Sequence, residues 1–300
     1  MTGWRGRNTV LIFHDPRSVE YARAGHVERP QRIASSVSVL KERHPTWQWR
    51  TPAAATEKML LRAHSEEHLR RIGAAADDFD PDCPAYADTF EHAARAAGAA
   101  VDVAHAAMAG ERAFSLMRPP GHHATRDRAM GFCYFNHIAI AALDALETGV
   151  EQIALWDFDA HHGNGTEAII ANHPRIAFAS IHQSPLYPGT GLRSFANISN
   201  FPVAPMTSRA EHMAVIQRAL KTLLAFQPSL LLVSAGFDAY AGDPITQLAL
   251  EAEDFATCGK WLRDTGLPAG AILEGGYSDA LPELINAFLT AWSDEETALS

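Results

Sequence analysis

The segment LWDFDAHHGNG, residues 155–165, places Asp157, Asp159 and His161 at alternate positions after an apolar run. Side chains at i, i+2 and i+4 share one face of an extended chain but spread around a helix, so this spacing predicts a strand. Stacked carboxylates that lose hydration are costly unless cations compensate their charge. One Asp, the His and a carboxylate from another strand would hold a tetrahedral zinc ion and leave one position free for water or substrate. Asp238, in the loop after another apolar run, is the best candidate for the third ligand.

Polar clusters also follow other predicted strands and would meet this segment at one edge of a parallel sheet. Ligands bind at the carboxyl ends of the strands in such sheets. Taken singly, each polar residue is more easily explained as a helix cap in a loop, and their coincidence is what favours a site. The clusters are RPPGHH (118–123), HQSPLYPG (182–189), AGFDAYAGDP (235–244) and EGGYS (274–278).

Short apolar runs alternate with amphipathic segments along the whole chain. This alternation predicts an α/β fold with a central, mostly parallel β-sheet flanked by helices on both faces. We interpret residues 1–300 as a single domain. The apolar runs predict strands at 9–13, 113–117, 153–158, 176–181, 230–234 and 271–273. The amphipathic segments predict helices near 30–42, 89–108, 137–147, 209–225, 252–264 and 281–292.

Composition excludes several classes of protein. The 300 residues include 25 basic and 35 acidic side chains and carry a formal net charge of −10, with no basic run that could follow a phosphate backbone, so we expect no nucleic-acid binding. No stretch approaches the roughly 18 apolar residues that span a bilayer, so we expect no membrane insertion. Three scattered cysteines indicate a reducing compartment. We expect a soluble, cytoplasmic protein.

Some conspicuous residues favour structure over chemistry. HSEEH (64–68) has histidines four residues apart but lacks the Glu that follows the first His in a zinc-protease helix, and Ser65 is typical of a helix N-cap. Trp47 and Trp49 are interpreted as packing residues. GNGT is interpreted as a turn into a helix that begins near Thr166. We find no G-x-S-x-G nucleophile elbow and no phosphate-binding loop.

Six motifs, in order along residues 13–277, resemble the histone deacetylase and acetylpolyamine amidohydrolase superfamily, which has an arginase-like fold. GHVERPQRI (25–33) and the Asn of HHGNG are similar to the class II branch and its bacterial relatives. The resemblance implies a metal-dependent amide hydrolase. The six motifs are RPPGHH, GFCYFN, WDFDAHHGNGT, SIHQSPLYPGTG, AGFDAYAGDP and EGGYS.

The resemblance implies two metal ions. Zinc would be held by Asp159, His161 and Asp238, in agreement with the choice made from spacing, although this donor set would also accept iron(II) or cobalt. A monovalent cation, commonly potassium in the family, would lie behind the zinc. Its ligands would be the side chains of Asp157 and Ser180 and the carbonyl oxygens of Asp159, His161 and Ile181.

The resemblance also implies catalytic roles. His123 would be the general base that later protonates the departing amine. His122 would hydrogen-bond to Asp157 and act as a charged or polarised partner. Asn164 would lie behind His123, where many class I relatives have Asp, and Tyr277 would donate its hydroxyl group to the scissile carbonyl.

Substrate-binding residues follow from the same resemblance. Phe132 and Tyr187 would form the aromatic walls of an acyl-lysine channel, which suit an extended methylene chain. The carbonyl of Gly131 would accept the substrate amide hydrogen, and Asp82 would meet a peptide backbone or an ammonium group at the rim. Eukaryotic polyamine specialists have Glu directly after the GDP motif, whereas this chain has Ile245.

The resemblance therefore implies a zinc-dependent amidohydrolase that removes acetyl groups from the side-chain amine of acetyl-lysine in peptides or proteins, or from similar alkyl amines. An acetylpolyamine amidohydrolase that acts on small acetylated amines is the main alternative. A non-catalytic reader of acetylated partners would not need the paired histidines and the tyrosine. An arginase-type manganese hydrolase would need more carboxylate ligands. The acyl-chain preference, the native metal and any homo-oligomer stay open.

Overall fold

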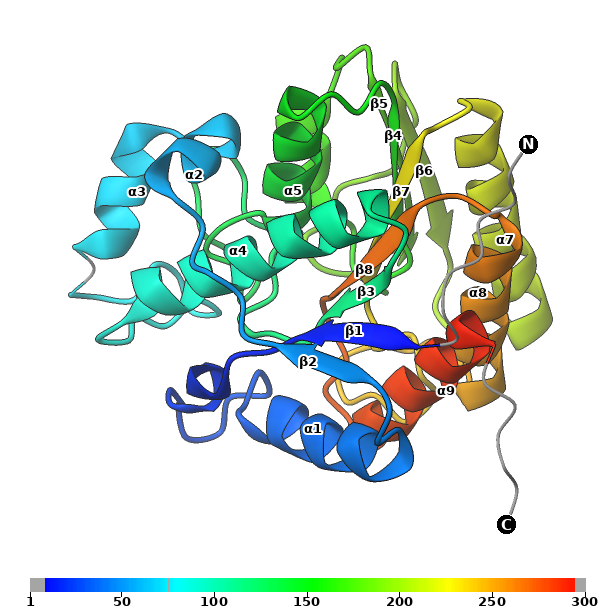
Figure 1. Ribbon diagram of the computed structural model, residues 1–300, viewed down its shortest axis with the longest axis horizontal. Coiled ribbons are helices and arrows are strands. Elements are labelled where there is room, and N and C mark those ends of the chain that lie inside the picture. Colours follow the sequence, from blue (N-terminus) through cyan, green and yellow to red (C-terminus); the bar gives the residue numbers. More distant parts are fainter. Residues whose placement is uncertain (1–8, 75, 295–300) are drawn as a thin grey trace.

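The computed structural model describes residues 9–74 and 76–294. Within these ranges the strands form one eight-stranded sheet, and every neighbouring pair runs parallel (Figure 1). The predicted α/β fold with a central, mostly parallel sheet is therefore confirmed. In their order across the sheet, the strands are β2 (Gln48–Arg50), β1 (Val10–Phe13), β3 (Arg112–Ser115), β8 (Ala269–Leu273), β7 (Leu230–Ala235), β4 (Ile153–Asp157), β5 (Ile176–Gln183) and β6 (Ile198–Val203).

Helices cover both faces of this sheet, as predicted (Figure 1). Successive side chains of a strand point to opposite faces, so in β4 Ala154 and Trp156 belong to one hydrophobic core while Ile153 and Leu155 belong to the other. The first core includes residues of α1 (Gln31–Arg43), α7 (Arg209–Ala225), α8 (Ala252–Asp264) and α9 (Leu281–Ser293). The second includes residues of α2 (Glu57–Ala63), α3 (Glu66–Gly73), α4 (Thr89–Met108), α5 (His137–Glu147) and α6 (Asn164–Ile170). A short 3-10 helix spans Pro16–Val19.

The main differences from the sequence prediction lie at the edges of the fold. The helices predicted at 89–108, 137–147, 209–225 and 252–264 have the bounds of α4, α5, α7 and α8. The edge strands β2 and β6 and the helix α2 were not predicted, and α3 was foreseen only through its N-cap residue Ser65. The helix α6 begins at Asn164, two residues before the predicted start near Thr166. Edge strands lack a second hydrogen-bonded neighbour, and β6 tolerates Pro202 for that reason.

The HSEEH segment is structural, which confirms its interpretation. Ser65 Oγ accepts the backbone N–H of His68 at 3.2 Å and caps α3. His64 and His68 are both buried, and His68 Nε2 lies 2.7 Å from the carbonyl oxygen of Tyr134. Trp47 is also buried, with its ring stacked 3.8 Å from that of His44.

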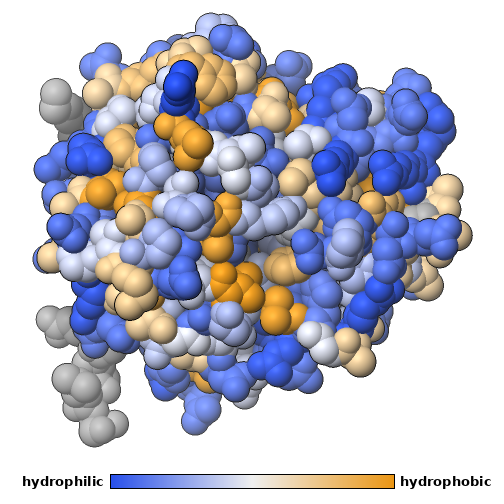
Figure 2. Space-filling model, turned by 180° about the vertical axis from the view of Figure 1, so that it is seen from behind, coloured by the Kyte–Doolittle hydropathy of each residue, from blue (hydrophilic) through white to orange (hydrophobic). Residues whose placement is uncertain are grey.

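Among the helices that the structure describes, none is long and apolar enough to cross a bilayer. Hydrophilic side chains cover most of the face shown in Figure 2, and apolar ones are scattered among them. The three cysteines are buried and free.

Candidate active site

The polar clusters predicted to converge lie at the ends of five neighbouring strands of the sheet. RPPGHH comes after β3, EGGYS comes after β8, and AGFDAYAGDP, DFDAHH and HQSPLYPG begin at the ends of β7, β4 and β5. Because all five strands are parallel and adjacent, their carboxyl ends lie at one edge. The sheet therefore brings these clusters to one place.

Asp159, His161 and Asp238 are buried side by side, and their potential ligand atoms all lie within 4.8 Å of one another. His161 Nδ1 is 2.7 Å from Asp238 Oδ2 and 3.3 Å from Asp159 Oδ1. Of the residues that the structure describes, only these three form such a cluster of His, Cys, Asp and Glu side chains. The choice made from spacing thus corresponds to one compact donor set.

Backbone groups fix the orientation of both carboxylates. Asp159 Oδ2 accepts the N–H of Gly275 at 2.7 Å, and Asp238 Oδ1 accepts the N–H of Ala160 at 2.8 Å. A Cβ atom at Gly275 would lie only 2.5 Å from Asp238 Oδ2 and 2.6 Å from Asp159 Oδ2. Glycine is therefore needed at residue 275, because any side chain there would fill the space between the two carboxylates.

The chemistry of this donor set fits a divalent metal ion. Burial and the neighbouring charge of Asp159 raise the pKa of Asp238 to about 7, which is the response of a carboxylate with too little compensating charge. Two carboxylates and one imidazole are ligands that zinc accepts, and three protein ligands leave a coordination position open. The three residues present therefore fit a zinc ion.

Two histidines in tandem, His122 and His123, lie beside this cluster. His122 Nδ1 is 3.1 Å from Asp157 Oδ2, and His123 Nδ1 is 2.7 Å from Asn164 Oδ1. The two rings lie 4.1 Å apart. An amide oxygen only accepts hydrogen bonds, so Nδ1 of His123 carries the hydrogen and Nε2 keeps a free lone pair.

The two imidazoles have pKa values shifted in opposite directions. Burial would lower the pKa of His122, but the charges of Asp159 and Asp157 and the hydrogen bond to Asp157 outweigh burial and hold that pKa well above its ordinary value. Burial, with the charges of His122 and His161, holds the pKa of His123 well below its ordinary value. At neutral pH His122 is therefore charged and His123 is neutral. Neighbouring groups whose pKa values are pushed apart in this way are typical of a site with distinct acid and base roles.

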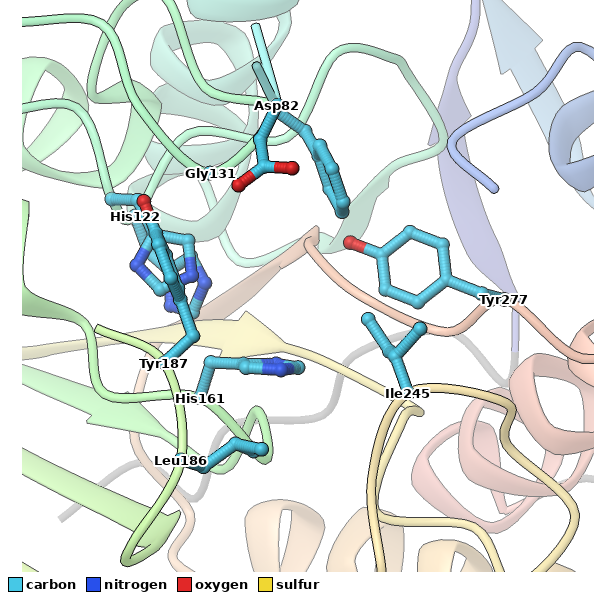
Figure 3. A pocket seen from close by; sticks show the side chains of 10 residues that line it. Asp82, His122, Gly131, His161, Leu186, Tyr187, Ile245 and Tyr277 are labelled. Atoms are coloured by element: carbon cyan, nitrogen blue, oxygen red, sulfur yellow. The ribbon is translucent and has the colours of Figure 1, made fainter. Parts of the chain in front are cut away.

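A cavity of about 210 Å³ lies between His122, His161 and Tyr277 (Figure 3). It contains all four residues predicted to bind substrate, and Asp82 among them is exposed, so it lies at the rim. Gly131 has a φ of +55°, and a Cβ atom there would lie 2.5 Å from His123 Cδ2. The lining residues are Asp82, His122, His123, Gly131, Phe132, His161, Leu186, Tyr187, Ile245 and Tyr277.

Tyr277 lies across the cavity from the tandem histidines, with its hydroxyl group pointing into the space between them (Figure 3). Its backbone N–H donates to Asp243 Oδ2 at 2.8 Å, and its ring meets the ring of Phe132 edge-on at 5.5 Å between centroids. The guanidinium of Arg32 lies 4.7 Å from the centroid of the Tyr277 ring. Burial outweighs this cation and raises the pKa of Tyr277 well above its ordinary value, so the hydroxyl keeps its proton.

The residues predicted to hold a monovalent cation lie deeper in the sheet. Asp157 at the end of β4 is directly opposite Ser180 in β5, and Ile181 follows Ser180. All three are buried. The cation itself stays a prediction.

Sequence reasoning missed several residues that support the site. Asp243 also accepts the N–H of Ile245 at 3.1 Å, and Arg32 Nε donates to the carbonyl of Gly276 at 2.7 Å. Leu186 lines the cavity, and Glu274 contacts the tandem-histidine loop. Asp243, Arg32, Leu186 and Glu274 all lie inside quoted motifs, so their positions were visible although their contacts were not.

A model of the histone deacetylase domain matches residues 26–292 of the chain. The chain belongs to this family. It is 36% identical to the histone deacetylase-like amidohydrolase of Pseudomonas aeruginosa over 86% of this chain and 74% of that protein. It is 34% identical to the probable deacetylase of Methanothermobacter thermautotrophicus over 96% of this chain and 92% of that protein. The crystal structure of the acetylpolyamine aminohydrolase from Burkholderia pseudomallei superposes with a TM-score of 0.87, at 27% identity, over 95% of this chain and 98% of that one.

Membership of the histone deacetylase family confirms the superfamily predicted from six motifs. The protein is a deacetylase or amidohydrolase and therefore a hydrolase. The family does not by itself specify which acylated amine this chain cleaves.

Proposed function

We propose that the protein is a zinc-dependent amidohydrolase that removes acetyl groups from the side-chain amine of acetyl-lysine. The observation that carries this proposal is the position of two histidines, hydrogen-bonded to Asp157 and Asn164, between a metal-binding cluster and the hydroxyl of Tyr277. The opposed directions of their pKa shifts agree with it. A binding module would have no use for a neutral imidazole beside a charged one. Amide hydrolysis needs both, because a proton must leave water and then reach the departing nitrogen.

In this proposal Asp159, His161 and Asp238 hold the zinc ion. When bound, zinc supplies Lewis-acid polarisation of the amide carbonyl and lowers the pKa of water towards neutrality. These three residues fit the role because they are buried, because backbone N–H groups orient both carboxylates, and because none of them forms a competing ion pair with Lys or Arg in the described chain.

The side chains around the cavity carry the proton transfers. His123 accepts a proton from the attacking water at Nε2 as the bond between the water oxygen and the acyl carbon forms. Tyr277 donates its hydroxyl hydrogen to the carbonyl oxygen as negative charge develops there. His123 then gives its proton to the nitrogen while the C–N bond breaks, so the free amine leaves together with acetic acid, which keeps the second proton of the water. The charged His122, held by Asp157, stabilises the negative intermediate throughout.

The shape and polarity of the cavity support an alkyl amide as substrate. Phe132 and Tyr187 provide flat apolar surfaces, and Leu186 and Ile245 extend the apolar lining. Asp82 is the one lining residue outside the tandem-histidine and metal clusters that carries a formal charge. A methylene chain with its reactive amide at the bottom satisfies this arrangement.

A rate comparison on zinc-loaded protein tests the substrate. We expect acetyl-lysine peptides to exceed acetylputrescine and acetylspermidine in kcat/KM, because no carboxylate stands at residue 245 to meet a distant ammonium group. Ile245→Glu should raise kcat/KM for the acetylated polyamines by about tenfold, as one partly buried ion pair would. Ile245→Gln is the matched uncharged control. A preference of the unchanged enzyme for the small amines by a hundredfold or more would favour the acetylpolyamine amidohydrolase alternative.

The pH profile tests the role of His123. A general base must be neutral, and the pKa of His123 is held below the ordinary value of 6.5, so activity should persist below pH 6.5 and fall only as the imidazole gains its proton. Asn164→Asp would place a carboxylate 2.7 Å from Nδ1 and favour the charged imidazole, which moves the acid limb of kcat/KM to higher pH by about one unit. Asn164→Ala, which adds no charge, should not move the acid limb to higher pH. An unchanged limb in Asn164→Asp would remove His123 from the role of base.

A further inference from the structure

Glu274 is a completely buried carboxylate for which the proposed function has no use. It follows β8 directly, and its exposed fraction is 0%. Oε2 accepts the backbone N–H of Gly121 at 2.7 Å and that of His122 at 3.1 Å, and Oε1 accepts the hydroxyl of Ser234 at 3.2 Å. In the described chain it makes no ion pair. Its three partners are neutral donors. Glu274 therefore acts by fixing the positions of these three groups relative to one another.

These contacts join the ends of two strands to the loop that carries the tandem histidines. Ser234 lies in β7, whereas Gly121 and His122 lie in the loop after β3 and have no strand register to fix them. On its other side, the carbonyl of His122 accepts the N–H groups of Gly165 and Thr166, both at 3.1 Å. The backbone of His122 is thus hydrogen-bonded on both sides, through its N–H to Glu274 and through its carbonyl to the start of α6.

The segment that contains Glu274, residues 274–277, also reaches the other side of the cavity. The N–H of Gly275 holds Asp159, and Tyr277 follows two residues later. A shift of Glu274 would therefore change the position of His123 relative to the phenol that faces it. Both groups must act on one substrate carbonyl, and a misplacement of about 1 Å can cost a hundredfold in rate.

We propose that Glu274 is a positioning residue that fixes the tandem-histidine loop relative to Tyr277 through its length and its hydrogen-bond acceptors. The proposal rests on the proposed function. Its charge is not what matters: a carboxamide of the same length keeps all three contacts, with its oxygen towards Gly121 and His122 and its NH₂ group towards the Ser234 hydroxyl, which can accept. Shortening the side chain by one methylene keeps the charge and breaks the contacts.

Two substitutions separate length from charge. We expect E274D to lower kcat for an acetyl-lysine peptide by about thirtyfold or more, with KM within about threefold, because alignment is lost and substrate binding is kept. E274Q should keep kcat within about fivefold of the unchanged enzyme. Zinc content per chain and the melting temperature are measured for both variants. A residue that serves stability alone would change the melting temperature and leave kcat unaltered at temperatures well below it.

Three results would overturn the proposal. E274D with near-normal kcat would show that the contacts are not needed. If E274Q lost as much of its kcat as E274D, the effect would come from the charge of Glu274. If E274D lost its zinc, the fall in kcat would come from the metal cluster. If E274D does not fold, the test rests on E274Q alone. The kcat of E274Q must then stay within about fivefold of that of the unchanged enzyme while the variant holds zinc. Failure of the proposed function itself would appear instead as full activity in the variants of Tyr277 and Asp238 considered below.

Discussion

Tyr277→Phe is expected to slow turnover by about a hundredfold or more while one zinc ion per chain is retained. The phenol hydroxyl points into the cavity, opposite the tandem histidines, and its raised pKa keeps it protonated. A single donor aimed at a developing oxyanion contributes on the order of 3 kcal/mol to transition-state stabilisation, which sets the size of the effect. The measurement is kcat for an acetyl-lysine peptide, with zinc quantified on the same sample.

The substitution leaves the surroundings of the ring intact. Phenylalanine keeps the edge-on contact with Phe132 and the approach of Arg32, and the backbone N–H still donates to Asp243. The melting temperature should therefore stay close to that of the unchanged protein. Turnover near the normal rate in Tyr277→Phe would remove this hydroxyl from the chemistry.

Asp238→Asn is expected to abolish stoichiometric zinc binding and to lower kcat/KM by at least about a thousandfold. The substitution removes one of two carboxylates from a cluster in which His161 Nδ1 lies 2.7 Å from Asp238 Oδ2. An amide is a much poorer zinc ligand than a carboxylate, and loss of the Lewis acid removes several kcal/mol of transition-state stabilisation. Zinc per chain is measured after dialysis against metal-free buffer.

Asp264→Asn is the matched control for this change. Asp264 ends α8, and its side chain is half exposed in an ion pair with Arg263. This variant should keep both zinc and activity. An Asp238→Asn protein that binds one zinc ion per chain and turns over normally would contradict the assignment of the metal ligands.

The central sheet could be predicted from sequence because its strands are buried on both faces and therefore form continuous apolar runs, such as 230–234. The helices α7 and α8 have the predicted bounds because their buried residues recur at helical spacing and form an apolar stripe. The helices α4 and α5 are rich in Ala and other apolar residues and are buried over most of their length, which also made them visible. The edge strands β2 and β6 were missed for the opposite reason. β2 has three residues and is only partly buried, and β6 contains Asn200 and Pro202, so neither has an apolar run to find.

In the candidate site too, some residues could be predicted from the sequence and others could not. Asp157, Asp159 and His161 were visible because of their alternate spacing, although the strand expected from that spacing ends at Asp157, and Asp159 and His161 lie in the irregular segment after it. Asp238 was visible because it follows another strand. Glu274 was not singled out, because its partner Gly121 lies 153 residues away and offers only a backbone N–H, which every residue but proline carries. Sequence shows which side chains bear chemistry, whereas the residues that hold them through backbone contacts become visible only when the chain is folded.

The most direct test of this account is anomalous diffraction at the zinc absorption edge from crystals of the protein soaked in zinc. We expect one strong peak per chain, within bonding distance of Asp159, His161 and Asp238, with the Tyr277 hydroxyl facing it across the cavity. Absence of a peak between these three side chains, or a peak that lies elsewhere, would contradict the proposal that this enzyme hydrolyses amides at a single zinc ion.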